Sequence, residues 1–545
     1  MPPAPTPPDG TSARPASPSF DGGCARPAPA PLDRAAAGPV PASPDGTPAR
    51  LAPATPDGTS ARPAAPERAS GPFPDEGPSR RGVVVGLAAA GGVALLGAPR
   101  VAAAEVRRAA VPGARRAVVL RGRPAAEAER LRMQTVYRTT EFVPTGLYLP
   151  PGRPLTLEVR APDGPLPTLH VGAPDTNPDT AYRYPRAHPL TEGVNTVTDA
   201  GGGMVYLSFT GDRRANAVVR FGPEGVPAPT YVLAPSSGCG DPALATRAAW
   251  QGRPAFAAPV FAPAGTTEAE FQAQVDAFTQ APFVELVSPQ MIVTVRRETF
   301  LQVRDQDHAQ LMTLLEQVED VEAAISGLDG SAPLHAPTPL GRHLVNVRPE
   351  YGPKSTAYAT HAYTAYYDAY ATTRLLLPDK VRTTGWGVYH ELGHQHQQMA
   401  WRPGELTEVT VNIYSLAVQR HFGMPSNLVT GNAYETALAK LPVADYAGLG
   451  AFEKLVPFRQ LELGFGDDFH PRVHRLVREE TPPSSAGDSA RRFTLMALYF
   501  SRVAGRDLSG FLRAWAFPIP ESGYAELAAL GLPAPDADLT RLSER

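Results

Sequence analysis

The feature that most constrains this chain is the pentapeptide His-Glu-Leu-Gly-His at positions 390–394. On an α-helix, residues four positions apart lie one turn apart on the same face, so His390 and His394 can reach one metal ion. Glu391 then lies beside the open coordination position of that metal, where hydrolysis needs a general base for water. The pentapeptide therefore predicts the metal-binding helix of a zinc peptidase.

The residues around the pentapeptide are typical of a helix. Gly385 and Gly387 precede it, positions 389–400 contain no proline, and Pro403-Gly404 follows. This pattern predicts a helix over 389–400. A solvated helix whose histidines only pair with carboxylates is the alternative, and the downstream residues bear on that choice.

A catalytic zinc usually takes three protein ligands and leaves its fourth position to water. The metzincin class is excluded, because Gln397 and Ala400 stand where that class needs glycine and histidine. The remaining candidates for the third ligand are Glu405 and Glu408. Glu408 opens the segment 408–418, whose apolar residues recur at helical spacing and predict a second helix. Glu405 lies nearer the proline-glycine break and reads as a solvated loop residue, so the pattern favours Glu408.

Two further polar residues lie close to these candidates. Asn412 lies one turn after Glu408 on the same helix face, where it is either a hydrogen-bond partner of the site or a surface amide. His396 follows His394 by two residues and points away from the predicted metal face, so we expect it at the surface.

These segments resemble the enhancin-type, mucin-degrading zinc metallopeptidases of peptidase family M60, which are gluzincins. The resemblance rests on the pentapeptide, on Gln395 and Trp401 after it, and on Glu-Val-Thr-Val-Asn-Ile-Tyr-Ser-Leu at 408–416. Three further segments match the family, at 144–152, 458–469 and 511–520. The likeness covers residue 131 to the C-terminus, and Ala516 departs from it where a glycine-like turn residue is usual.

The resemblance implies a site and a cofactor. His390, His394 and Glu408 would bind one Zn²⁺ ion, and Glu391 would be the catalytic base. It also implies a gluzincin arrangement, with zinc in a cleft between an α/β lobe and a helical lobe.

The pattern of strands and helices divides the chain. Short alternating segments separated by Pro, Gly and Asp turns fill residues 131–235 and predict a jelly-roll-like β-sandwich accessory domain. Residues 239–545 predict an α+β, mostly helical metallopeptidase domain. Its predicted elements are strands at 283–286 and 291–296, a helix at 305–328, and helices after residue 386.

The first 130 residues have a different character. Residues 1–79 are dominated by Pro, Ala, Gly and Ser and offer too little apolar surface for folding, so we expect a disordered tail. Residues 80–104 open with Arg80-Arg81, continue with an apolar stretch and end in alanines, which is typical of an export signal, here of twin-arginine type. A retained signal anchor is the alternative, and residues 105–130 read as a linker.

Composition bears on the partners of the chain. The net charge is −3 and no basic patch stands out, which disfavours a nucleic-acid partner. The two cysteines are Cys24, in the predicted tail, and Cys239, so a processed chain would hold one thiol and no internal disulfide.

Tyrosines surround the predicted metal helix. Zinc peptidases gain from a Tyr or His donor placed against the oxyanion of the tetrahedral intermediate. The tyrosine-rich segment 358–370, Tyr389 and Tyr414 are candidates for that donor. Aromatic packing under the cleft explains them equally well, so no donor is assigned.

Together these features predict an exported zinc metalloendopeptidase that uses Glu391 to assist attack of a zinc-bound water on a peptide bond. The resemblance implies O-glycosylated, mucin-like glycoprotein substrates, recognised through peptide and O-glycan. Two alternatives stand beside this prediction. One is a non-cleaving, glycoprotein-binding adhesin with a peptidase fold, and the other is an envelope peptidase acting on unglycosylated protein. Membrane attachment is expected only through a retained signal anchor.

Overall fold

The computed structural model describes residues 116–162, 164–233, 265–348, 350, 356–480 and 487–544. The predictions for the tail 1–79, the export signal 80–104 and the two cysteines lie outside these residues. Within the described ranges, none of the helices combines the length and the apolar character that a membrane crossing requires.

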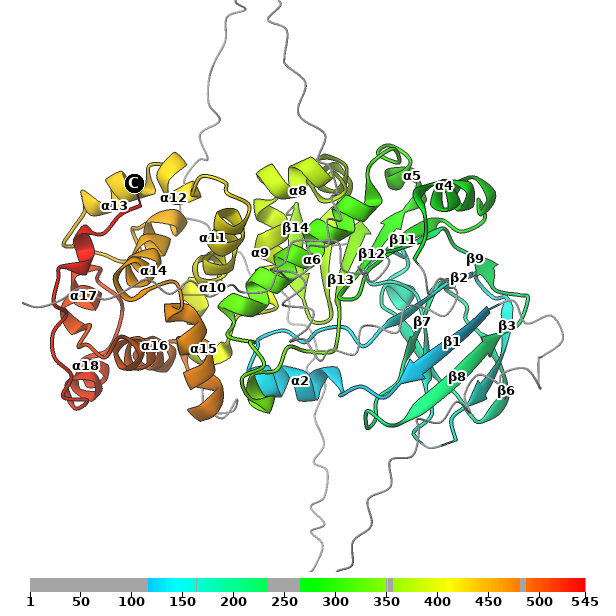
Figure 1. The fold of residues 1–545 in the computed structure, drawn as a ribbon, viewed down its shortest axis with the longest axis horizontal. Helices are drawn as coiled ribbons and strands as arrows, with labels where there is room; N and C mark the ends of the chain where they lie inside the picture. The colour runs from blue at the N-terminus through cyan, green and yellow to red at the C-terminus, as the bar shows by residue number, and fades with distance from the viewer. Residues whose placement is uncertain are drawn as a thin grey trace, which may run out of the picture. The chain divides into compact units, whose positions relative to one another are not determined.

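Two antiparallel sheets open the described part of the chain (Figure 1). The first has the order β1-β8-β3-β6, with β1 at Arg116–Arg121, β8 at Asn216–Phe221, β3 at Pro154–Arg160 and β6 at Gly193–Thr198. The second has the order β5-β4-β7-β2-β9, with β5 at Arg186–Pro189, β4 at Thr168–Val171, β7 at Gly203–Ser208, β2 at Val143–Leu149 and β9 at Val226–Pro227. Both sheets contribute to one apolar core, which makes them a β-sandwich.

Strand β7 is buried on both faces. Successive side chains of a strand point to opposite faces, and here Val205 and Leu207 enter the core of the sandwich. Met204 and Tyr206 alternate with them and enter a second apolar core, together with residues of a third sheet such as Ile292. The sandwich is therefore packed directly against the second half of the chain.

The third sheet has six strands of mixed direction, in the order β10-β11-β12-β13-β15-β14. Their bounds are β10 Thr230–Val232, β11 Phe283–Val287, β12 Met291–Arg296, β13 Arg342–Val347, β15 Tyr363–Tyr367 and β14 Ala357–Thr360. Strands β12, β13 and β15 are parallel, and β14 runs antiparallel at the edge. Helix α6, His308–Ile325, packs on the face opposite the sandwich through residues such as Leu311 and Leu315.

Helices dominate the remainder of the chain. The main ones are α8 Pro378–Thr384, α9 Trp386–His394, α10 Thr407–Thr410, α11 Asn412–His421, α14 Ala451–Phe465, α15 Phe469–Glu480, α16 Ser489–Ala504, α17 Ser509–Ala514 and α18 Glu521–Ala528. Shorter helices complete the set, including α2 Ala126–Met133, α4 Glu268–Ala277, α5 Arg297–Phe300, α7 Asp368–Tyr370, α12 Asn427–Thr430 and α13 Ala433–Leu438. Figure 1 shows α9 and α11 between α6 and the C-terminal helices, and α11 contacts α6, α9 and α14.

The secondary structure predicted for the peptidase half is confirmed in kind. The predicted strands at 283–286 and 291–296 are β11 and β12. The predicted helix at 305–328 contains α6, and helices follow residue 386. The structure therefore contains a β-rich N-terminal domain and a domain of mixed strands and helices.

Two assignments in the N-terminal half are wrong. Residues 105–130 are not simply a linker, because β1 lies within them and places Val118 and Leu120 in the sandwich core. Because arginines flank this short apolar segment on both sides, composition alone does not distinguish it from a linker. Residues 230–232 were expected in the sandwich, but they form β10 and pair with β11 of the third sheet.

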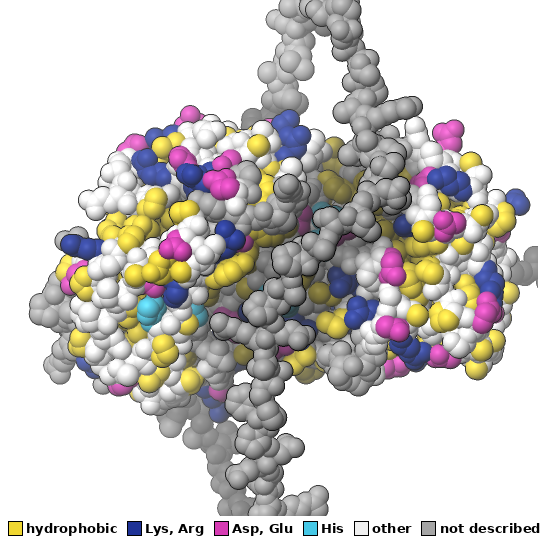
Figure 2. Space-filling model, turned by 180° about the vertical axis from the view of Figure 1, so that it is seen from behind, with side chains coloured by type: hydrophobic (Ala, Val, Ile, Leu, Met, Phe, Trp, Pro, Cys, Tyr) yellow, Lys and Arg dark blue, Asp and Glu magenta, His cyan; other side chains and the backbone are white. Residues whose placement is uncertain are grey.

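Charges of both signs are interspersed among the described residues on the face that Figure 2 shows. Exposed ion pairs such as Arg513 with Glu521 and Arg491 with Glu526 add little stability, because water screens them. The pKa values of groups in a buried site of this chain therefore depend mainly on the charged and polar groups in direct contact with them.

One buried hydrogen-bond network joins the sandwich to the third sheet. The Tyr206 hydroxyl donates to Glu285 at 2.7 Å and lies 3.0 Å from the hydroxyl of Thr294. The Glu285 side chain is completely buried, and burial raises its pKa to about 7. Loss of the Tyr206 hydroxyl would leave this carboxyl group with one partner fewer.

We expect Tyr206→Phe to lower the free energy of unfolding by about 1–3 kcal/mol, the cost of removing one partner of a buried polar group. Chemical denaturation followed by circular dichroism measures this change. Tyr184→Phe is the control, since Tyr184 belongs to the same domain and is 58% exposed. Equal unfolding curves for the two variants would contradict the role of the network.

Candidate metal centre

Helix α9 contains the pentapeptide, and the apolar face of the helix packs into the core of the helical region. Val388 and Leu392 are fully buried in the core of the helical region. Gly393 faces α11, and a Cβ at this position would come within 3.2 Å of both Tyr414 and Val411. The glycine of the pentapeptide therefore allows the close approach of α9 to the segment that carries Glu408.

Helix α9 ends at His394, so the prediction that it continues to Ala400 is wrong. The following glutamines are buried and make hydrogen bonds away from the helix. Gln397 donates to the Thr407 carbonyl at 2.8 Å, and Gln398 donates to the Met133 carbonyl at 3.2 Å. Buried amides need such partners, and these partners lie on distant segments that helical spacing cannot reveal.

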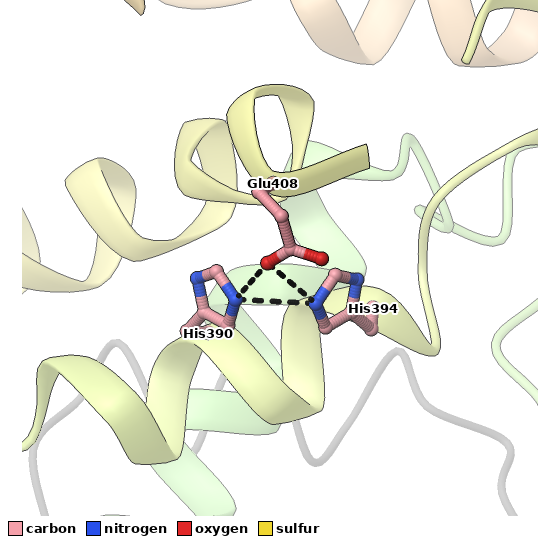
Figure 3. A group of neighbouring side chains, drawn as sticks. All are labelled: His390, His394 and Glu408. Carbon is pink, nitrogen blue, oxygen red and sulfur yellow. Dashed lines mark hydrogen bonds and ion pairs between the residues drawn. The ribbon is translucent and has the colours of Figure 1, made fainter. Parts of the chain in front are cut away.

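The structure brings His390, His394 and Glu408 together (Figure 3). His390 Nε2 lies 3.0 Å from Glu408 Oε2 and 3.1 Å from His394 Nε2. His394 Nε2 lies 3.6 Å from the same carboxylate oxygen. Glu408 belongs to α10, which with α11 forms the predicted second helix, interrupted at Val411.

The ring orientation of His390 is held by Asn412. Asn412 Oδ1 lies 2.8 Å from His390 Nδ1, and the Asn412 amide nitrogen donates to the Glu408 carbonyl at 2.9 Å. Because the amide nitrogen is engaged elsewhere, the oxygen faces the ring and His390 donates through Nδ1. The hydrogen-bond interpretation of Asn412 is therefore confirmed, and the residue is buried rather than a surface amide.

Gln397 holds the second ring in the same way. Its Oε1 lies 2.8 Å from His394 Nδ1, while its amide nitrogen donates to the Thr410 hydroxyl at 2.7 Å. The sequence reasoning used Gln397 only to exclude a class of peptidase and missed this role. All three residues between His394 and Gln398 are polar, and this polar run directly after the metal helix was the available signal.

The donor atoms fit a zinc ion. With both Nδ1 atoms donating, each Nε2 carries a lone pair, and the two Nε2 atoms lie 3.1 Å apart with a carboxylate oxygen beside them. Tetrahedral zinc with bonds near 2.0–2.1 Å places its ligand atoms about 3.3 Å from one another. The separations of 3.0, 3.1 and 3.6 Å surround this value.

The two carboxylates at the site differ in environment. When the two rings are protonated, hydrogen bonds from His390 and His394 hold the pKa of Glu408 well below its usual range. Burial raises the pKa of Glu391, and the two histidines partly offset this effect. Glu391 is only 8% exposed. One carboxylate is thus held ionised among the ring nitrogens, while the other has an increased affinity for a proton.

The tyrosine candidates separate into two groups. The Tyr389 hydroxyl donates to the Val381 carbonyl, and the Tyr414 hydroxyl donates to the His396 carbonyl at 3.0 Å. Burial and then the charge of Glu391 raise the pKa of Tyr366 and Tyr370. The second pair therefore lies within the electrostatic reach of Glu391, whereas the hydroxyls of the first pair are engaged elsewhere.

His396 is buried, so the expectation of a surface histidine is wrong. It is 1% exposed, its Nδ1 lies 2.9 Å from the Ser326 hydroxyl, and its Nε2 accepts from Arg342 at 2.8 Å. Arg342 also donates to Glu319 at 2.9 Å. Glu319, Glu322 and His396 are close enough to hold a cation, but the Arg342 guanidinium already supplies positive charge there. We therefore interpret this second cluster as a buried ion-pair network.

Glu405, the rejected third-ligand candidate, lies outside the site. It is exposed in a short turn and accepts a hydrogen bond from the Ser489 hydroxyl. Ala516, the departure from the family pattern, has a φ of 54°, in the left-handed region where glycine is favoured.

The fold is that of known metallopeptidase catalytic modules. The catalytic module of the metalloprotease ZmpA from Clostridium perfringens superposes with a TM-score of 0.60 at 17% identity, covering 78% of this chain and 80% of that one. A conserved protein of unknown function from Bacillus anthracis str. Ames gives 0.67 at 24% identity, over 78% and 81%. A metallopeptidase solved in complex with Tn antigen gives 0.62 at 16%, over 79% and 80%.

Family models match two parts of the chain. The model for peptidase M60, enhancin and enhancin-like, matches residues 254–516, and the model for the N-terminal domain of M60-like peptidases matches residues 124–220. The chain therefore belongs to the M60 peptidase family, and this prediction is confirmed. Membership of this family implies a metal.

Curated relatives include TRPM8 channel-associated factors. Factor 3 of Rattus norvegicus is 24% identical over 411 residues, which cover 71% of this chain and 39% of the relative. The homolog of Xenopus laevis is 23% identical over 424 residues, which cover 74% and 41%. The chain thus spans about two fifths of the length of these two relatives.

Proposed function

We propose that this chain is an exported zinc metalloendopeptidase that cleaves O-glycosylated, mucin-like glycoproteins. The observation that carries the proposal is the convergence of two ring-nitrogen lone pairs and one carboxylate oxygen. His390, His394 and Glu408 would hold a single zinc ion, because each ring is oriented by an amide oxygen and the separations suit a tetrahedral ion.

Each residue of the site has a distinct role in this proposal. Zinc bound there would supply a Lewis acid that polarises the scissile carbonyl and lowers the pKa of a water toward neutrality. Glu391 accepts a proton from the attacking water and delivers it to the leaving amine nitrogen. Its buried position, which raises its pKa, suits a group that must both accept and release a proton. Asn412 and Gln397 keep the rings of His390 and His394 in the tautomer that presents Nε2.

The substrate class is supported from two sides. Strand β14 is the edge strand of the mixed sheet and contacts α9, so an extended peptide could add to this edge beside the catalytic helix. A neighbour of the same fold was solved with Tn antigen, which is consistent with a glycoprotein substrate here.

The N-terminal domain and the location complete the proposal. We infer a jelly-roll-like sandwich that braces the peptidase domain through Tyr206 and its neighbours. Export rests on Arg80-Arg81 and the apolar segment after them, within 80–104.

Digestion of native and enzymatically deglycosylated mucin, each with and without a chelator, tests this function. The proposal expects chelator-sensitive cleavage that requires the glycans. Equal cleavage of both substrates would favour a general peptidase, and binding without cleavage would favour an adhesin. Either result would overturn the assignment of a mucin-specific enzyme.

We expect Asn412→Ala and Gln397→Ala each to weaken zinc binding by about 10- to 100-fold, because the rings lose the acceptor that sets their tautomer. Competition with a zinc chelator measures this affinity. Gln310→Ala is the control, since Gln310 is exposed on α6. Zinc affinity in the Asn412 and Gln397 variants equal to that of Gln310→Ala would contradict the positioning role.

A further inference from the structure

A cavity lies between the sandwich and the mixed sheet. Its volume is about 710 Å³, within the range of small-molecule sites. Arg296 is the last residue of β12 and Arg348 directly follows β13, so two of its lining residues mark the carboxyl ends of parallel strands. In open α/β sheets this edge is where ligands are usually bound. None of the proposed zinc ligands lines the cavity.

The lining of the cavity carries an excess of positive charge. Four arginines line it and Glu298 is the single acidic residue among its lining residues, the arginines being Arg186, Arg296, Arg297 and Arg348. Three of them form ion pairs with acidic residues: Arg186 with Asp199, Arg296 with Asp368, and Arg348 with Glu298.

Arg297 differs from the other three arginines. It donates to the Val275 carbonyl at 2.8 Å, and its Nε is buried without a hydrogen-bond partner. Among the described residues, no carboxylate forms an ion pair with Arg297. Partial burial of a guanidinium without an acidic partner costs free energy unless an anion binds beside it. Arg297 therefore leaves an uncompensated positive charge in the cavity.

The sandwich contributes a wall of the cavity that is aromatic and rich in glycine. Tyr182 lines it, and a Cβ on Gly201 would lie 2.3 Å from the Tyr182 ring. Gly202 and Gly203 continue this wall, and both have a positive φ that favours glycine. The Gly201 and Gly202 N–H groups donate to Asp199, so what this wall offers a ligand is an aromatic ring and peptide carbonyls, whose second lone pair can accept from hydroxyl groups. Arg186 lies 5.4 Å from the centre of the ring.

We propose that this cavity binds an acidic saccharide, with the anionic group at Arg297 and Arg348 and the sugar ring against Tyr182 and the glycine wall. Guanidinium groups bind carboxylate and sulfate through charge-assisted hydrogen bonds. The aromatic and hydroxyl-binding wall favours a sugar over an acidic peptide. The inference concerns binding alone and does not rest on peptide hydrolysis at the metal centre.

Titration of the full chain with 3′-sialyllactose and with lactose, followed by calorimetry, tests the proposal. The acidic sugar should bind and the neutral sugar should not. Arg297→Gln should weaken binding about tenfold, the change expected from losing one charge-assisted hydrogen bond. Glu298→Gln should strengthen binding several-fold, because the native carboxylate competes for Arg348 at 2.8 Å.

Arg513→Gln is the matched control, since this exposed arginine also lies on a tyrosine ring, 3.6 Å from the centre of Tyr524. It should leave binding unchanged. Equal affinity for both sugars, or no effect of Arg297→Gln, would overturn the proposal. Two further titrants separate the chemistry. Tighter binding of sodium sulfate alone would show an anion site without sugar recognition, and tighter binding of a hexaglutamate peptide would show a peptide site. Each of those results would also overturn it.

Discussion

Glu391→Gln is expected to reduce peptide hydrolysis by about 10²- to 10⁴-fold, the usual contribution of a general acid-base. The amide is close in shape to the carboxylate but cannot accept a proton from water. Glu391 is not among the three groups whose ligand atoms converge, so the variant should retain its metal. Cleavage of a fluorogenic glycopeptide and metal content by mass spectrometry measure both quantities on one sample.

Measuring cleavage and metal content together distinguishes a role of Glu391 in proton transfer from a role as metal ligand. Lost cleavage with metal retained is expected only if Glu391 acts on the proton transfer rather than on the ion. Retained cleavage would remove Glu391 from the mechanism. Loss of metal together with cleavage would instead make it a ligand and contradict the assignment of three donors.

Glu408→Ala is expected to weaken zinc binding by more than about 100-fold, beyond the effect of removing an indirect partner of a ligand, and to remove cleavage with it. The reason is that Glu408 supplies the anionic donor beside His390 and His394, at 3.0 and 3.6 Å. Equilibrium dialysis against buffered zinc measures the affinity.

Glu405→Ala is the matched control for this loss. Both glutamates lie between Gly404 and Thr410, but Glu405 is exposed and hydrogen bonded to Ser489. It should retain zinc and activity. If the two variants behaved alike, the distinction between ligand and loop residue would fail.

Local periodicity was sufficient to predict the centre of the site. His390 and His394 are one helical turn apart, and Glu408 begins a segment with its own helical period, so sequence spacing placed all three. Asn412 followed from the same period, since it lies one turn after Glu408. These are short-range relations within one or two helices, which spacing alone can express.

Relations between distant segments could not be predicted in this way. Helix α9 ends at His394 because the buried glutamines after it find partners such as the Met133 carbonyl. His396 is buried because α6 and Arg342 pack against it. Strand β1 belongs to the sandwich because two of its apolar side chains, those of Val118 and Leu120, reach a core made by other strands. In each case tertiary packing decides, and no single window of sequence contains both partners.

Strand β7, whose two faces enter different cores, has a consequence for dividing the molecule. A shortened protein beginning at residue 239 would lack Met204 and Tyr206 and would leave Ile292 and Val345 uncovered. It would also lack β10, and β11 would become a bare sheet edge. Exposed apolar surface next to an unpaired strand promotes aggregation, so the catalytic half is expected to be insoluble when produced without its amino-terminal partner.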